Sequence, residues 1–200
     1  FKVSSNFNKY SSVPSRRGMS GMEAARRVLD ANGLQNVQIE MVGGKLSDHY
    51  DPSSRRVRLS KDVYQGTSIA SISVACHECG HAIQHSIGYG PLTIRSLLVP
   101  ITNFASTLAI PLFLLGFLFS IPGLETIGIL FFSGAVIFQC VTLPVEFNAS
   151  SRAIVQMENL GIIDGQERGS AKKVLGAAAM TYVAAMLVSL LQLARLILLS

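Results

Sequence analysis

Three long stretches without a charged side chain constrain the fold more than any other feature of the sequence. They run from Ser96 to Leu124, from Thr126 to Val145 and from Val174 to Ala194. Each reaches the ~20 residues that an α-helix needs to cross the hydrocarbon core of a bilayer. Charged residues make up only 14% of the chain, against roughly 25% in soluble domains. We therefore expect a mainly α-helical membrane protein with about three transmembrane helices.

The polar first part of the chain is expected to form a small α+β unit that starts with a helix. Ser20 and Glu23 have the spacing of a helix capping box, which predicts a helix from about Gly21 to Ala31. The pair Asn32-Gly33 is a typical stop signal directly after it.

Two short strands are expected next, because apolar and polar residues alternate in "VQIEMVGG" and "RVRLS". The turn-rich segment "SDHYDPSS" separates them. The side chains expected to point inward are Val37, Ile39, Met41, Val57 and Leu59.

The segment after Gly66 predicts a helix that starts at a cap on Thr67 or Ser68 and ends at Gly88. This helix carries the motif "HECGH", in which His77 and His81 are four residues apart. Residues i and i+4 lie on the same helical face, so both rings can point at one ion.

The spacing H-E-x-x-H on a helix indicates a zinc site with hydrolytic chemistry. Two imidazoles suit Zn²⁺ and leave room for a third protein ligand and a water. Glu78 follows His77 directly, so it would lie beside that water and act as general base rather than as a ligand. We expect one Zn²⁺ per chain.

Two cysteines around Glu78 raise an alternative, a Cys-x-x-Cys redox site formed by Cys76 and Cys79. Such a pair is usually found at an exposed helix start after a strand, whereas these residues fall in mid-helix. We expect Cys76 to pack in the core, and Cys79 to be a crowded candidate for a zinc ligand.

The third zinc ligand is expected to be Glu146. His85 continues the i, i+4 series, but it lies about 12 Å along the helix axis from His77, too far to share one ion. Glu146 follows the second apolar stretch, so two membrane crossings would return it to the side of the histidines. The alternative is that Glu146 only marks the membrane interface, with Asp48, Asp51 and Glu158 as reserve ligands.

Further polar residues are candidates for contact with the substrate. His49 and Tyr50 could supply a donor to the oxyanion of the tetrahedral intermediate, and Arg152 could do the same or anchor a carboxylate. The strand "RVRLS", if it is a sheet edge beside the site, could pair with an extended peptide.

The distribution of basic residues predicts the orientation in the membrane. Lysine and arginine number twelve before Ser96 and four between Glu146 and Lys173, whereas the turn between the first two apolar stretches carries only Glu125. The positive-inside rule then places the site on the cytoplasmic side of the cell membrane. The net charge of +5 fits anionic lipid headgroups, and we expect no nucleic-acid partner because recognition motifs and stacking aromatics are missing.

The motifs together resemble the bacterial membrane-bound neutral zinc metallopeptidases of the YugP type. The resemblance extends over most of the chain, through "MSGMEAARRVLD", "LSDHYDP", "VRLS", "HECGH" and "LPVEFNASSRA". It implies a zincin-like catalytic unit, a zinc-dependent endopeptidase activity and an additional N-terminal membrane helix.

A fainter resemblance is to the heat-shock and prenyl-protein membrane metalloproteases of gluzincin type, whose third-ligand motif is Glu-Phe-x-Ala-Asp-x-x-Ala. Here "EFNASSRA" matches that motif at Glu146, Phe147, Ala149 and Ala153. It differs at Ser150, where the wider group has an aspartate that orients a zinc-binding histidine.

From these observations we predict four parts: a catalytic α+β unit (1–95), a transmembrane hairpin (96–145), a helix with the third ligand and a loop (146–173), and a C-terminal transmembrane helix (174–200). The expected function is cleavage of peptide bonds in membrane or membrane-proximal proteins, and cleavage within and beside the bilayer both stay open. The expected partners are protein or peptide substrates and the lipid bilayer, with a membrane-protein complex or oligomer as a further option. One alternative is an inactive or regulatory zinc-containing membrane scaffold. A second is a zinc carrier, which would need acidic or histidine residues along a path through the membrane, and only Glu125 is near such a path.

Overall fold

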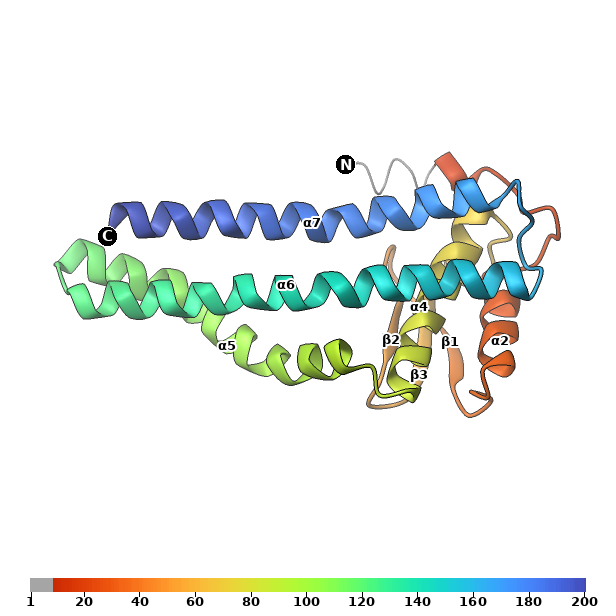
Figure 1. Cartoon of the computed structure of the whole chain (residues 1–200), viewed down its shortest axis with the longest axis horizontal. Coiled ribbons are helices and arrows are strands. Elements are labelled where there is room, and N and C mark those ends of the chain that lie inside the picture. The colour runs from red at the N-terminus through yellow and green to blue at the C-terminus, as the bar shows by residue number, and fades with distance from the viewer. Residues whose placement is uncertain (1–8) are drawn as a thin grey trace. The chain divides into compact units, whose positions relative to one another are not determined.

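The computed structural model describes residues 9–200, without the side chain of Pro122. Figure 1 labels its elements, which follow in the order α2 (Gly21–Ala31), β1 (Gln38–Val42), β2 (His49–Asp51), β3 (Arg56–Ser60), α3 (Lys61–Tyr64), α4 (Ile69–Ser86), α5 (Gly90–Phe119), α6 (Pro122–Asn159) and α7 (Arg168–Leu199). The chain forms two compact units. The first unit holds the residues up to 89 together with 146–180, and the second holds 90–145 and 181–200. The functional domains expected from the sequence stay a prediction.

The first helix of the first unit confirms its sequence signals. α2 spans Gly21–Ala31, and its capping box is complete. The amide of Glu23 donates to Oγ of Ser20 at 3.2 Å, and the amide of Ser20 donates to Oε2 of Glu23 at 2.8 Å. These bonds satisfy backbone donors that the first turn of a helix leaves without partners.

The sheet has the strand order β1-β3-β2, which corrects two expectations. First, β3 pairs in parallel with β1 and antiparallel with β2, so "RVRLS" is the central strand, and the idea that it is an edge that receives a peptide is wrong. Second, the segment expected to be only a turn contains β2. The local alternation pattern shows which residues can be strands, but pairing between distant segments decides their order.

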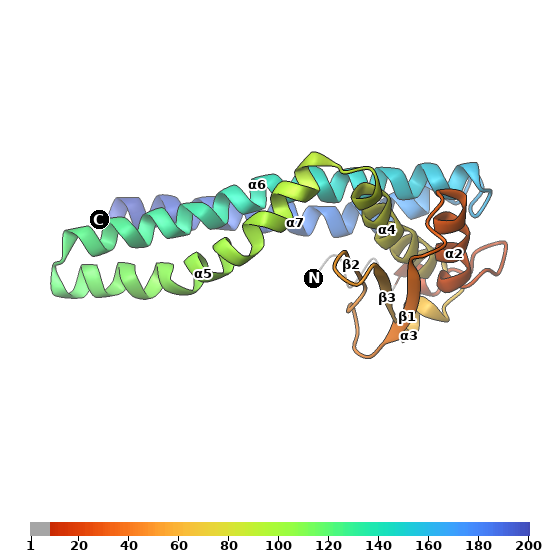
Figure 2. The same cartoon turned by 90° about the horizontal axis from the view of Figure 1, so that it is seen from below.

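One face of the sheet packs against the helices of the same unit, as Figure 2 shows for α2 and α4. Val57 and Leu59 of β3 are fully buried, as expected, and Val37 and Ile39 also pack in or against this core. Met41 is 51% exposed, so its expected inward position is wrong. It lies one residue before the end of β1, a strand whose residues are all exposed or half-buried.

Helix α4 forms the centre of the first unit. It starts at the cap Ser68, whose Oγ accepts from the amide of Ser71 at 3.1 Å, and it ends at Ser86, two residues before Gly88 with a φ of 63°. Most of its side chains are buried, including Ile72, Cys76 and Ile83. A helix buried nearly all round holds its functional side chains in fixed positions.

Within residues 9–200, three helices are long and apolar enough to cross a membrane, within Gly90–Phe119, Gly123–Asn159 and Arg168–Leu199. The sequence suggests that one helix ends and another begins near Glu146. In the structure, helix α6 instead continues without a break through Pro144 to Asn159. Within the second unit, a Cβ on Gly128 would lie 2.6 Å from the backbone of Phe113, so α5 and α6 are in close contact there. Many large apolar side chains of this unit are exposed, such as Phe104 and Leu118, which fits a surface that faces lipid.

A test of the packing in the first unit is the substitution Gly21→Ala. A Cβ at Gly21 would lie 2.2 Å from the carbonyl oxygen of Val63, and that backbone oxygen cannot move as a side chain can. Overpacking of this kind costs about 1–3 kcal/mol, so we expect a lower melting temperature of the detergent-solubilised protein. Gly43→Ala is the control, because a Cβ at Gly43 meets open space. Equal melting temperatures for the two variants would contradict this account of the contact.

Candidate metal centre

Three side chains from two helices converge in the first unit. His77 and His81 come from α4, and Glu146 comes from α6. The Oε2 atom of Glu146 lies 3.3 Å from Nε2 of His77 and 3.7 Å from Nε2 of His81. The three potential ligand atoms lie within 4.8 Å of one another. The chain has thus brought together the three residues that the sequence suggests as metal ligands.

Two of the three distances among these atoms are close to those expected around a tetrahedral metal ion. With bonds of about 2.0–2.1 Å from Zn²⁺ to nitrogen or oxygen, two ligand atoms at a tetrahedral angle are about 3.3–3.4 Å apart. The two distances to Glu146 are close to this value. The two imidazole rings are nearly perpendicular, with an interplanar angle of 84°, so their ε nitrogens approach one point from different directions. Two imidazoles and one carboxylate are also a donor set that zinc accepts.

A glycine on α4 permits the close approach of α6. A Cβ at Gly80 would lie 2.6 Å from the carbonyl oxygen of Ala149 and 3.1 Å from its Cα. Gly80 directly precedes His81 in the sequence, and Ala149 follows Glu146 by three residues. The contact therefore sets the distance between the histidines and the carboxylate.

The remaining ring nitrogens of both histidines have partners in the same unit. Nδ1 of His77 lies 3.1 Å from Oγ of Ser150. Nδ1 of His81 lies 3.0 Å from Oε1 of Gln84. These contacts turn both ε nitrogens toward Glu146, as outer partners do for histidines that bind a metal.

The electrostatic environment favours a cation between these groups. Burial lowers the pKa of His81, but hydrogen bonding to Glu146, the charges of Glu78 and Glu146, and hydrogen bonding to Gln84 outweigh this and raise it above the usual range. Glu146 is 3% exposed and Glu78 is 8% exposed. Two buried carboxylates beside two imidazoles create a negative potential that a divalent cation would neutralise.

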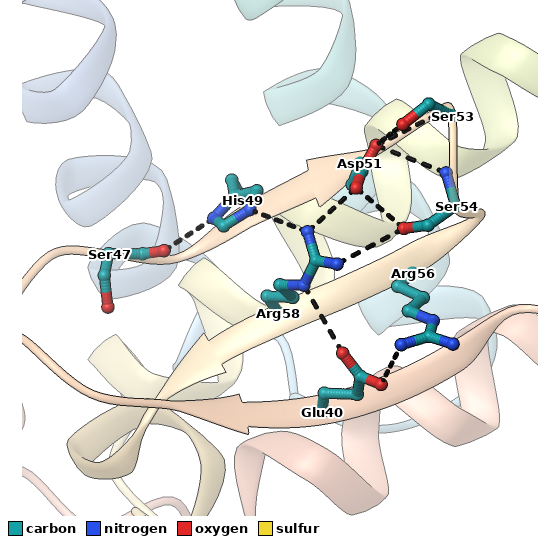
Figure 3. A network of polar contacts seen from close by, with 8 residues as sticks. All are labelled: Glu40, Ser47, His49, Asp51, Ser53, Ser54, Arg56 and Arg58. Atoms are coloured by element: carbon teal, nitrogen blue, oxygen red, sulfur yellow. Dashed lines mark hydrogen bonds and ion pairs between the residues drawn. The ribbon is translucent and has the colours of Figure 1, made fainter.

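His49 lies away from this cluster. Its Nδ1 is 2.7 Å from the carbonyl oxygen of Ser47, and its Nε2 is 3.5 Å from Nη1 of Arg58. Figure 3 shows Arg58 at the centre of a polar network on the sheet, where it also contacts Asp51 and Glu40. These contacts place His49 in the network around Arg58 and Asp51.

Tyr50 points from the neighbouring position of β2 to a different partner. Its hydroxyl lies 2.8 Å from Nδ1 of His85. Both residues line a pocket of about 250 Å³ together with Val37, Arg55 and Ala82. His85 is thus engaged with Tyr50 and is not part of the cluster, which agrees with its exclusion on distance grounds.

The reserve ligands are also engaged elsewhere. Asp48 accepts from the amide of Ser60 at 2.7 Å, and Asp51 accepts from Arg58 at 2.8 Å. Glu158 pairs with Arg168 at 2.8 Å. These carboxylates have structural roles in the first unit.

The two cysteines around Glu78 are fully buried. Burial raises the pKa of both the Cys76 and the Cys79 thiol far above its usual range, so both stay protonated. Sγ of Cys79 lies 3.6 Å from the carbonyl oxygen of Ala25, on the side of α4 that faces α2. A neutral, buried thiol is neither a good metal ligand nor a redox nucleophile.

Arg152 is connected to the cluster through two residues that the sequence analysis missed. Its Nε donates to Oδ1 of Asn148 at 2.7 Å, and Nε2 of Gln84 donates to the same oxygen at 3.0 Å. Gln84 in turn contacts His81. For Gln84 a signal was present in the sequence, because it follows His81 by three residues and so lies on the same helical face. Asn148 follows Glu146 by only two residues, so helical periodicity gave no such signal for it.

Comparison with known proteins gives two matches. A family model described as "Putative neutral zinc metallopeptidase" matches residues 1–200. A protein of Bacillus subtilis (strain 168), named "Putative membrane protease YugP", is 55% identical over 197 residues, which cover 98% of this chain and 88% of the relative. No solved structure matches the chain.

The contact between Gly80 and Ala149 generates a prediction about metal binding. Gly80→Ala would push α6 away from α4 by about 1 Å, and metal sites tolerate misplacement of only about 0.5 Å. We expect at least about tenfold weaker zinc binding, measured by competition with a chromophoric chelator. Gly134→Ala on α6 is the control, because a Cβ there meets open space. Unchanged zinc affinity in Gly80→Ala would show that this contact does not set the ligand spacing.

Proposed function

The chain belongs to the neutral zinc metallopeptidase family, and from this premise we propose that it is a membrane-embedded zinc endopeptidase. Its substrates would be peptide bonds of membrane or membrane-proximal proteins. The match to a relative named a membrane protease and the three long apolar helices support this proposal.

The observation that carries the proposal is the convergence of His77, His81 and Glu146. We propose that these residues hold one Zn²⁺ and leave a fourth position for water or substrate. A zinc ion in such a site makes a bound water acidic near neutral pH and polarises the scissile carbonyl. The spacing of the three donor atoms and the donor chemistry support this role.

Glu78 is proposed as the general base. It follows His77 on α4, and its buried carboxylate contributes to the negative potential at His81. The carboxylate would take a proton from the attacking water and deliver it to the nitrogen of the leaving amine. Burial in a site of low dielectric strengthens this proton transfer relative to water.

Of the three residues suggested for oxyanion or substrate contact, Arg152 has the strongest support. It is linked to His81 through Asn148 and Gln84. Tyr50 is bonded to His85, and His49 belongs to the network around Arg58. We therefore propose Arg152 as the first residue to test for contact with a substrate carbonyl or carboxylate.

The proposed location is the cytoplasmic membrane, with the site on the cytoplasmic side. The excess of lysine and arginine outside the apolar stretches supports this orientation, since loops with positive charge stay in the cytoplasm. The net charge of +5 would then face anionic headgroups.

The first experiment separates the enzyme from a zinc-binding scaffold. Glu78→Gln keeps the three proposed ligands but removes the base, so we expect normal zinc content and cleavage slowed by about 10²–10⁴-fold. Zinc is measured in the purified protein, and cleavage is measured on a membrane protein substrate in proteoliposomes.

Two further variants complete this test. Glu146→Ala is expected to lose both zinc and cleavage, whereas Glu158→Gln, which changes a carboxylate of the same helix outside the cluster, is expected to keep both. Cleavage by Glu78→Gln at the normal rate would refute the role of the base. Normal zinc content in Glu146→Ala would refute the ligand assignment.

The orientation is tested by labelling single cysteines in intact cells. In a Cys140→Ala background we expect Gly123→Cys, in the first turn of α6, to react with a membrane-impermeant maleimide from outside. Lys45→Cys, on an exposed loop of the first unit, is expected to react only after the cells are permeabilised. The opposite labelling pattern would place the site outside the cytoplasm.

A further inference from the structure

We infer that a groove between α6 and α7 in the first unit binds a phospholipid with an anionic headgroup. The phosphate contacts Lys172 and Arg168, and one acyl chain follows the apolar part of the groove. The inference goes beyond the proposed function and needs only a chain that lies in a membrane. Three long apolar helices and a relative named a membrane protease support that location.

The groove belongs entirely to the first unit. Its lining residues all come from the end of α6 and the start of α7, between Phe147 and Ala179. Its volume is about 370 Å³, within the range of roughly 300–1,000 Å³ that is typical of small-molecule sites. A whole phospholipid is larger than this, so the groove holds the headgroup and the first part of one acyl chain.

One end of the groove carries a net positive charge. Arg168 is the first residue of α7, and its Nε lies 2.8 Å from Oε1 of Glu158, which is near the end of α6. This ion pair places that end of the groove beside the turn between the helices, and it balances the charge of Arg168. Lys172 lies one helical turn further along α7 and is exposed. Within residues 9–200, its ammonium group makes no ion pair or hydrogen bond, so it can bind an external anion.

The rest of the groove is mainly apolar. Ile154 and Leu175 are buried beside it, and Phe147 and Ala179 line the end away from the turn. From Arg168 to Ala179 the groove follows α7 for about 16 Å, at 1.5 Å per residue. An occupant that fits this lining has an anionic group at one end and an apolar chain behind it.

This order of groups follows the membrane boundary in the sequence. Lys172 lies two residues before the apolar stretch 174–194, whereas Ala179 lies inside that stretch. On α6, Phe147 lies two residues after the apolar stretch 126–145. A phospholipid at the interface has the same order, with its phosphate outside the hydrocarbon layer and its chains within it. Basic pockets between membrane helices bind anionic headgroups in this way.

The groove also adjoins the candidate metal centre. Ser150 lines the groove, and its Oγ lies 3.1 Å from Nδ1 of His77. A lipid in the groove therefore contacts the segment of α6 that supplies Glu146 and Ser150.

The test uses a single tryptophan as a reporter in the full chain. The sequence contains no tryptophan, so Phe147→Trp introduces the only indole, at a groove residue that is 48% exposed and has room for a larger ring. The protein is placed in phosphatidylcholine vesicles that contain either brominated phosphatidylglycerol or the same share of brominated phosphatidylcholine. Bromine quenches a tryptophan in contact with the acyl chain. We expect about fivefold tighter binding of the anionic lipid, the effect of one lysine near an anionic surface.

Two pairs of variants in the reporter protein locate the site. Lys172→Gln is expected to abolish the preference, whereas Lys173→Gln, which removes the neighbouring charge outside the groove lining, is expected to keep it. Gly176→Leu is expected to abolish it by filling the groove, because a Cβ at Gly176 has no neighbour within 4 Å. Gly169→Leu is its control, since a Cβ there also meets open space but lies outside the groove lining. Thermal unfolding of each variant checks the fold.

Loss of the preference in Lys172→Gln and Gly176→Leu, but not in their controls, supports the inference. Equal quenching by the two brominated lipids in the reporter protein would overturn it, because the contact would then be that of ordinary bilayer lipid. Equal losses in Lys172→Gln and Lys173→Gln would also overturn it and would indicate a general attraction to basic residues. Weak quenching by both lipids would overturn it and show that a protein segment covers the groove.

Discussion

The contact between α4 and α6 is the constraint on which the site depends. Gly80 allows the backbone of Ala149 to approach α4 so closely that even a methyl group would collide with it. This approach brings the carboxylate of Glu146 to 3.3 Å and 3.7 Å from the two imidazoles. If the two helices were about one side-chain length further apart, the same three residues would be present, but they could not all bind one ion.

One segment of α6 supplies one proposed ligand and groups that contact or reach the other two. Glu146 and Ser150 are four residues apart, as are Asn148 and Arg152, so each pair shares a helical face. Ser150 contacts His77, and Asn148 reaches His81 through Gln84. The wider group has an aspartate at the position of Ser150, and here a hydroxyl and a neutral amide chain hold the rings instead. A neutral outer partner adds no further negative charge to a site that already contains Glu78 and Glu146.

Local signals predicted the helices well because the forces involved act between neighbours in the sequence. The capping box of Ser20 and Glu23 predicted the bounds of α2, and the absence of charge predicted three helices long enough to cross a membrane. The sheet was predicted less well. The segment with His49 and Tyr50 forms a strand, and β3 lies in the centre of the sheet rather than at its edge. Pairing between segments of different sequence position decides these features, and no local pattern contains that information.

The sequence by itself determined the family, the H-E-x-x-H helix and the candidate ligands, because residue types at helical spacing specify which groups share a face. The tertiary structure decided which carboxylate meets that face, since Asp48, Asp51 and Glu158 are engaged elsewhere while Glu146 reaches both histidines. It also decided that hydrogen bonds connect Arg152 to His81 through Asn148 and Gln84. Those bonds join residues of two helices that are more than sixty positions apart in the sequence, and only packing brings such residues into contact.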